Sequence, residues 1–153
     1  MSGAIYEFAR QPQARRDVTG DSERLRTAVE ETVRLHAPVV AVGRTVRKPV
    51  EVHGVALRPG DRIALNYAAA SCDPDVCANP QRFDVHRREV VHTAFGVGPH
   101  RCIGEHLARL EIRVAVEEFL RRIPDYMMKA GTQPQFESGQ LRTMKNLDLT
   151  WKT

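Results

Sequence analysis

The chain has 153 residues, of which 42% are hydrophobic and 27% are charged, as expected for one globular domain with an apolar core. Its 23 basic and 19 acidic residues give a mild net charge of +4, which suits an acidic protein partner. No basic stretch is interleaved with aromatic residues, so we expect no nucleic-acid binding.

The cysteines and the N-terminal sequence indicate in which cellular compartment the protein is expected. Cys72, Cys77 and Cys102 are an odd number of thiols without a C-x-x-C pair, which argues against a secreted disulfide scaffold. We expect unrelated thiols rather than a Cys72–Cys77 bridge. No apolar run is long enough to span a membrane, and the N-terminus does not resemble a signal peptide. A cytoplasmic protein without membrane contact is therefore expected.

Two helices are predicted at the start of the chain. Apolar residues recur at helical spacing over 2–10, and the pattern ends near Pro12. A turn is expected over 17–21. A second helix is predicted from Ser22, as its N-cap, to just before Pro38. Its apolar face consists of Leu25, Ala28, Val29 and Val33.

A small antiparallel sheet is expected next, because β-branched runs alternate with turn residues. His53-Gly54 fits a two-residue hairpin, and Pro59-Gly60 fits the two central positions of a type II turn. The predicted strands are residues 39–46, 50–52, 55–57 and 63–65.

The rest of the chain predicts a short helix over 66–71, a long helix from Gly104 to Arg122, and two strands over 126–128 and 147–151. The long helix has two apolar stripes, so we expect it to be largely buried. The stripes are Ile103, Leu107, Leu110 and Val114, and Ala108, Ile112, Ala115 and Phe119.

A glycine-rich loop precedes that long helix and ends in Cys102. Gly96 and Gly98 allow turns that a side chain would forbid and a close approach to a flat ligand. A helix N-terminus favours a thiolate, and His100 lies two residues before the sulfur. Such a loop is suited to holding a metal cofactor.

The loop Phe95-Gly96-x-Gly98-x-His100-x-Cys102-x-Gly104 resembles the haem-binding loop of the cytochrome P-450 monooxygenases, in which a cysteine thiolate binds the haem iron. The resemblance extends over nearly the whole chain but covers only the C-terminal part of a family member. It implies a mainly α fold with a small antiparallel β-sheet. Residues 1–153 would then be a single partial domain, with a K-helix, the sheet, the cysteine loop and the helix that follows.

The resemblance also implies a set of cofactor contacts. Cys102 would be the catalytic residue and the iron ligand of haem b, iron protoporphyrin IX. Arg44 and His100 would bind the haem propionates, for which a guanidinium fork is well shaped. The other implied cofactor contacts are Ala94, Phe95, Gly96, Ile103, Gly104 and Ala108.

Glu31-x-x-Arg34 places a carboxylate and a guanidinium on one helix face. An isolated pair of this kind is usually a solvated ion pair of little weight. Its context resembles the K-helix of the family, in which the pair is buried and joined by a second arginine. Arg82 matches that third position, and Arg87 and Arg88 are expected to be solvated.

The implied activity is hydroxylation of a hydrophobic small molecule with O2 and electrons from a ferredoxin-type partner, as in soluble bacterial members. That partner would dock near Arg101, Arg109 and Arg113. The implied substrate-lining residues are Val39, Val40, Phe136 and Leu141. The A-G-x-[DE]-T stretch of the distal helix does not occur, so an N-terminal half is expected to be missing.

Two alternatives remain open at this stage. The chain could be a truncated haem-binding or interaction module without monooxygenase activity. It could instead be a zinc module, because His100-x-Cys102-x-x-x-His106 approaches a ligand spacing and His92 lies upstream. A second paired cluster, which structural zinc sites usually have, is missing from the sequence.

Overall fold

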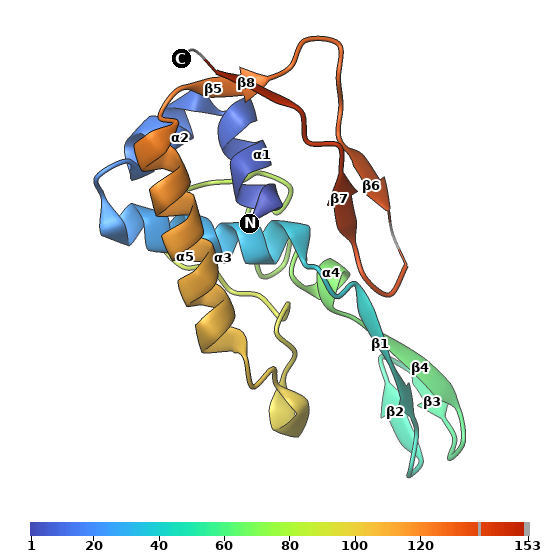
Figure 1. Ribbon diagram of the computed structural model, residues 1–153. Coiled ribbons are helices and arrows are strands. Elements are labelled where there is room, and N and C mark those ends of the chain that lie inside the picture. Colours follow the sequence, from blue (N-terminus) through green and yellow to red (C-terminus); the bar gives the residue numbers. More distant parts are fainter. Residues whose placement is uncertain (138, 152–153) are drawn as a thin grey trace.

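The computed structural model describes residues 1–137 and 139–151 of the chain. Helices form the main body, and short antiparallel strand pairs extend from it (Figure 1). The elements, in chain order, are α1 (Ser2–Arg10), α2 (Pro12–Val18), α3 (Ser22–His36), β1 (Ala41–Thr45), β2 (Val50–Val52), β3 (Val55–Leu57), β4 (Arg62–Asn66), α4 (Tyr67–Ala70), the 3-10 turn η1 (Gly98–His100), α5 (Glu105–Arg122), β5 (Tyr126–Met128), β6 (Gln135–Glu137), β7 (Thr143–Lys145) and β8 (Leu149–Trp151).

Helix α3 begins one residue earlier than predicted, because its cap lies at residue 21. Asp21, not Ser22, is the N-cap, and its carboxylate accepts hydrogen bonds from the amides of Glu23 and Arg24. Asp21 also forms an ion pair with the Arg24 side chain, which explains why it is preferred at this position. Helix α2 was not predicted. Pro12 stands in its first turn, where the missing amide hydrogen costs nothing.

The main core lies where α1, α2, α3 and α5 meet strand β5. Phe8 is completely buried and packs edge-to-face on Phe83, with ring centroids 5.7 Å apart. Val116 and Leu120 on α5 and Tyr126 on β5 complete this core. Helix α3 therefore has a fixed position: α1 reaches its end, where Glu7 lies 3.2 Å from His36, and the cysteine loop lies near the same end.

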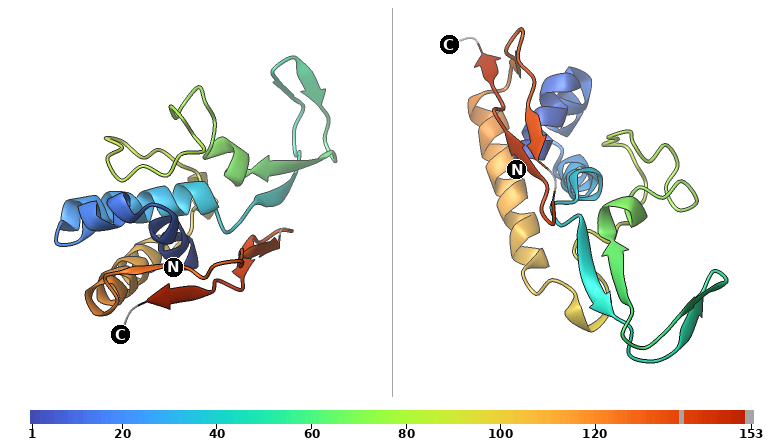
Figure 2. Two further views of the ribbon diagram at one scale, coloured as in Figure 1. Left: turned by 90° about the horizontal axis from the view of Figure 1, so that it is seen from above. Right: turned by 90° about the vertical axis from the view of Figure 1, so that its right-hand side faces the viewer.

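Among the described residues the strands form four two-stranded antiparallel sheets, and the small sheet expected over 39–65 divides into β1–β4 and β2–β3. Figure 2 shows β1–β4 and the β2–β3 hairpin extending away from the helices. The two predicted turns are confirmed. His53 and Gly54 both have positive φ (48° and 77°), as a type I′ hairpin requires. The amide of Asp61 donates to the Arg58 carbonyl (3.1 Å) around Gly60, whose φ is 95°.

Near the C-terminus, β5 pairs with β8, as the predicted strands suggested. The connection between them contains a further pair, β6 and β7, that was expected to be loop. Part of this connection returns to the end of α3. Val39 forms a bridge with Leu141, and the Arg142 amide donates to the Pro38 carbonyl (2.7 Å).

The prediction of a largely buried α5 is wrong for one of its apolar stripes. Ile103, just before the helix, is fully exposed, and the side chains of Leu107, Leu110 and Val114 are about half exposed. The second stripe packs inward, because Ile112 and Phe119 contact buried core residues. Helix α5 is thus amphipathic against α3 but presents a second apolar face to solvent. Among the described residues, no helix combines the length and hydropathy needed to cross a membrane.

Candidate functional site

The loop from Thr93 to Gly104 is shaped by two glycines and two backbone hydrogen bonds. Gly96 and Gly98 have φ values of 75° and 71°, a region that disfavours other residues. The Gly96 amide donates to Thr93 O (2.7 Å), and the Cys102 amide donates to Phe95 O (2.9 Å). The second bond folds the loop back on itself and leaves the Cys102 side chain exposed at its end.

The start of the loop is tied to the segment that follows β4. The Thr93 N–H donates to Ser71 Oγ (3.1 Å). Its hydroxyl donates to the Tyr67 carbonyl (3.2 Å). The Tyr67 hydroxyl lies 3.4 Å from where a Cβ on Gly96 would stand. A side chain at Gly96 would therefore be opposed both by its φ and by Tyr67.

A cavity of about 390 Å³ lies between this loop, the end of α3, strand β1 and helix α5. Its walls are mainly apolar, and Arg44 and His100 are the basic residues that line it together with Cys102. Eight of the predicted site residues line this cavity: Val39, Arg44, Ala94, Phe95, Gly96, His100, Cys102 and Ala108. Pro38, from the run expected to line the substrate pocket, contributes to its walls. Val42 and Ile112, which were not predicted, do so as well.

The other predicted contacts lie elsewhere. Ile103 is fully exposed and is not among the cavity residues. Gly104 leaves room beside the sulfur, because a Cβ there would be 3.9 Å from Cys102 Sγ. Phe136 lines a different cavity, next to the N-terminus and Arg142. Leu141 is exposed, and its bridge to Val39 brings it to the segment that contains Val40.

The donor set of the cavity fits a haem. An exposed thiol, a glycine that lets the backbone approach closely, and apolar walls suit a flat hydrophobic macrocycle bound through its metal. Haem also carries two carboxylates, and two basic residues line the same cavity. Arg44 is half-buried and donates to the neighbouring Gly43 carbonyl (2.8 Å), so within the described chain its guanidinium is not engaged by a carboxylate.

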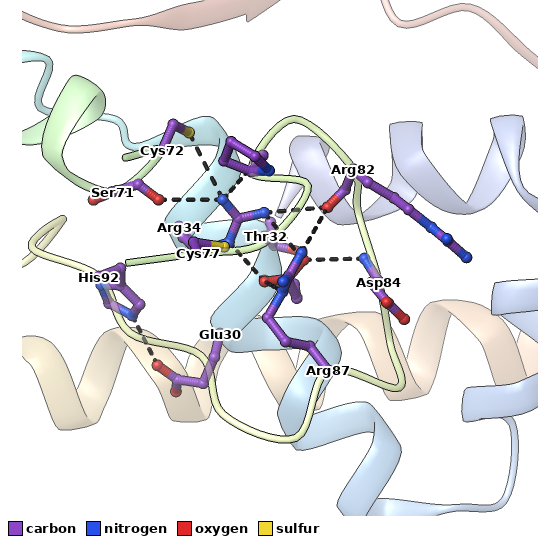
Figure 3. A network of polar contacts seen from close by, with 12 residues as sticks. Glu30, Thr32, Arg34, Ser71, Cys72, Cys77, Arg82, Asp84, Arg87 and His92 are labelled. Atoms are coloured by element: carbon purple, nitrogen blue, oxygen red, sulfur yellow. Dashed lines mark hydrogen bonds and ion pairs between the residues drawn. The ribbon is translucent and has the colours of Figure 1, made fainter. Parts of the chain in front are cut away.

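The Glu31–Arg34 pair is fully buried, with both side chains at 0% exposure. Arg34 donates twice to Glu31, from Nε to Oε1 (2.6 Å) and from Nη2 to Oε2 (3.1 Å). Its other donors reach backbone carbonyls that belong to Ser71, Pro80 and Arg82. Figure 3 shows how the guanidinium joins α3 to the irregular segment before the cysteine loop. The pair is thus structural, and its polar atoms are satisfied.

The third member of this network is Arg87, so the prediction of Arg82 was wrong. Arg87 donates from Nε to Glu31 Oε1 (2.8 Å), and its side chain is only 12% exposed. Arg82 contributes only its carbonyl, and Figure 3 shows its side chain pointing away. Burial alternates along this extended segment, with Phe83 and Val85 in the core. Arg87 has the same phase as these two residues, whereas Arg82 has the opposite one.

A second polar network was not predicted. Glu30 on α3 accepts hydrogen bonds from His92 (3.0 Å) and from Arg109 Nε (2.7 Å) and Nη2 (3.1 Å). Glu105 Oε2 accepts from Arg101 (2.7 Å) and from Arg109 Nη1 (2.8 Å). The spacing of Glu105 and Arg109, four residues apart on a helix, could have revealed this part of the network.

The two carboxylates are strongly acidic. Burial alone would raise the pKa of Glu30, but the hydrogen bonds from His92 and Arg109 outweigh it and lower the pKa to about 2. Hydrogen bonds from Arg101 and Arg109 lower the pKa of Glu105 to about 2. Both are therefore ionised at neutral pH, and they compensate the positive charge of Arg109.

Neither a Cys72–Cys77 disulfide nor a zinc site that includes Cys102 occurs among the described residues. All three cysteines are free, as expected for unrelated thiols. In the part of the chain that the structure describes, no three His, Cys, Asp or Glu side chains are grouped closely enough to hold a metal ion. The His106 side chain is 89% exposed and lies near Glu105. The zinc hypothesis thus has no ligand set among the described residues.

Comparison with known proteins agrees with this site. The family model described as "Cytochrome P450" matches residues 20–151. The chain is 38% identical to "Probable cytochrome P450 127A1" of Sinorhizobium fredii over 94% of its own length and 34% of that protein. It is 37% identical to a methyl-branched lipid omega-hydroxylase of Mycobacterium tuberculosis over 99% of its length and 36% of the relative.

Solved structures show the same similarity. P450BioI in complex with an acyl carrier protein ligated to hexadec-9Z-enoic acid superposes with a TM-score of 0.91 and 28% identity, covering 99% of this chain and 39% of that one. CYP109E1 of Bacillus megaterium in complex with testosterone superposes with a TM-score of 0.90 and 29% identity, covering 97% and 41%. The chain spans about a third of the length of the curated relatives it matches. On these grounds the chain belongs to the cytochrome P450 family.

Proposed function

We propose that this chain forms part of a haem-thiolate monooxygenase in which Cys102 binds the iron of haem b. The observation that carries the proposal is the cavity that exposes Cys102 together with Arg44 and His100. Bound haem would supply the activation of dioxygen, with the thiolate donating electron density to the metal. The family makes haem the expected cofactor.

The chain's own residues would bind and orient this group. The hydrogen bond from the Cys102 amide to Phe95 O fixes the backbone that carries the thiolate. Gly96 and Gly104 keep side chains away from the macrocycle and the sulfur. Ala94, Phe95 and Ala108 provide apolar walls that exclude water. Arg44 and His100 would hold the propionates by charge-assisted hydrogen bonds.

The substrate class that fits best is a hydrophobic small molecule. Val39 and Val42 make this side of the cavity apolar, and Val40 and Leu141 lie on adjoining backbone. Relatives named for lipid and steroid hydroxylation belong to the same family. Electrons would come from a ferredoxin-type donor near the exposed residues Arg101 and Arg113. Arg109 does not fit this docking role, because two carboxylates neutralise it. Three free thiols fit a reducing cytoplasm.

The exposed apolar stripe on α5 supports the proposal that monooxygenase activity needs more of the P450 fold. Leu107, Leu110 and Val114 lie along one helix face, and related structures contain more than twice the residues that align here. Without that remainder, haem binding without monooxygenase activity is the second candidate function. Turnover by the chain alone, compared with turnover by a full-length relative, distinguishes the two.

The reduced, carbon-monoxide-bound absorption spectrum of the haem-loaded chain tests the ligand. We expect a thiolate-type band that disappears in Cys102→Ser. Cys72→Ser is the matched control, since it removes a half-buried thiol outside the cavity, and it should keep the band. A band unchanged in Cys102→Ser, or no haem uptake by the wild-type chain, would overturn the proposal.

A further inference from the structure

Two adjacent acids on α3 serve different parts of the molecule. Glu31 is enclosed by Arg34 and Arg87. Glu30 instead faces His92 at the start of the cysteine loop (Figure 3). Glu30 also contacts α5 through Arg109. The Glu31 network joins α3 to the segment before the loop. Glu30 joins α3 to the loop itself and to the helix that follows it.

His92 links α3 to the start of the cysteine loop. Its side chain is 5% exposed, its Nδ1 accepts the Ala94 amide hydrogen (3.3 Å), and its Nε2 faces Glu30 Oε2 (3.0 Å). Because Nδ1 is an acceptor, these two partners assign the proton to Nε2, which donates it to Glu30. One side chain therefore connects the carboxylate on α3 to the backbone of a cavity-lining residue, Ala94.

Arg109 contacts the same part of the loop from α5. Its Nε and Nη2 form a two-pronged contact with Glu30, and its Nη1 donates to Glu105. The guanidinium carbon lies 4.5 Å from the centroid of the Phe95 ring, close enough for a cation–π contact. Phe95 is also the residue whose carbonyl accepts the Cys102 amide hydrogen. Arg109 thus restrains the residue that holds the cysteine backbone in place.

We infer that Glu30 and Arg109 are positioning residues for the Cys102 loop, acting through His92 and Phe95. Arg109 forms ion pairs with two carboxylates, those of Glu30 and Glu105. Its charge is therefore compensated within the chain and is not available to a docking partner. The loop would keep the same conformation before and after the cofactor binds. Where the inference concerns haem, it rests on the function proposed above.

Amide hydrogen exchange of the 153-residue chain without haem tests the inference independently of the cofactor. Arg109→Gln removes the positive charge and the paired N–H donors that bind Glu30. Glu30→Gln keeps the shape of the side chain but removes its negative charge. Since hydrogen bonds to charged groups are lost in both, we expect exchange of the Cys102 amide to be about tenfold faster. Arg109→Lys keeps the charge but not the planar fork, and it should not restore wild-type exchange.

The matched control is Arg121→Gln, which breaks an exposed ion pair with Glu118 on the same helix and should leave Cys102 exchange unchanged. The Leu120 amide, inside α5, reports on general stability. Faster exchange at Cys102 with unchanged exchange at Leu120 supports the inference. Equal acceleration of both amides, or no change at Cys102 in either variant, overturns it.

A second readout uses the haem-loaded chain. Arg109→Gln should shift the reduction potential or the carbon-monoxide band relative to wild type, and Arg121→Gln should shift neither. If the wild-type chain takes up no haem, the proposed function fails, while amide exchange still decides the role of Arg109. If haem binds and neither the spectrum nor the potential differs in Arg109→Gln, the positioning role toward the cofactor is refuted.

Discussion

Replacing Glu31 with alanine tests the buried network most sharply. Glu31 accepts four hydrogen bonds at distances of 2.6 to 3.1 Å: two from Arg34, one from Arg87 Nε and one from the Asp84 amide. Arg34 is fully buried, so the variant leaves its charge without a counterion in the protein interior. Removing one partner of a buried pair costs about 3–5 kcal/mol. That is a large part of the stability of a typical domain.

For a chain of this size, such a loss lowers Tm by roughly 6–20 °C. Urea unfolding followed by circular dichroism measures the free energy of unfolding directly. The matched control is Glu118→Ala, which removes the carboxylate of an exposed pair with Arg121 and Arg122 and should leave the midpoint unchanged. A Glu31→Ala midpoint equal to that of the control would refute the reasoning that burial makes this pair indispensable.

Three further outcomes are expected. Arg87→Ala should lower the free energy of unfolding more than Arg82→Ala, because only the Arg87 side chain reaches Glu31; equal urea midpoints would contradict this. The carboxyl of Glu30 has its pKa lowered from 4.5 to about 2, so its stabilising contribution is complete above pH 4.5 and is lost as the pH falls toward 2. Acid unfolding should therefore be less steep in Glu30→Gln over that interval, and identical profiles would count against the ion pairs. Replacing Leu107 and Leu110 with serine should leave Tm unchanged and reduce self-association measured by light scattering, since both side chains are exposed; a large drop in Tm would show that they are packed.

The elements set by local chemistry could be predicted from the sequence. The His53-Gly54 hairpin and the Pro59-Gly60 turn depend on φ values that those residues favour, and both were found. Helix α5 was located because its apolar residues recur at helical spacing, although its burial was not predicted correctly. Periodicity identifies an apolar face but not what covers it, and here one such face is exposed.

Features that depend on distant contacts were missed. Arg15 is buried in α2 because its guanidinium stacks over the Tyr126 ring at 4.7 Å, a contact between segments 111 residues apart. The choice of Arg87 over Arg82 depends on the burial phase of a segment without regular structure. Strands β6 and β7 have one apolar residue each, Phe136 and Met144, so they lack the apolar run that marked β2 and β3.

In the candidate site, too, the residues of the local motif were predicted, whereas contacts between distant segments were not. The motif identified Cys102, Gly96 and His100, and the structure brings them together with Arg44, which is more than fifty residues earlier in the chain. The Glu30–His92–Arg109 contacts were not predicted, because the members lie on three separate segments. The Glu105–Arg109 spacing on α5 could have indicated a part of that network, but it was not used.

X-ray absorption at the iron edge of the haem-loaded chain tests the central claim most directly, because it reports which atoms surround the metal. We expect one sulfur neighbour in addition to the porphyrin nitrogens, and the loss of that sulfur in Cys102→Ser. Iron coordinated by nitrogen and oxygen alone in the wild-type chain would contradict it.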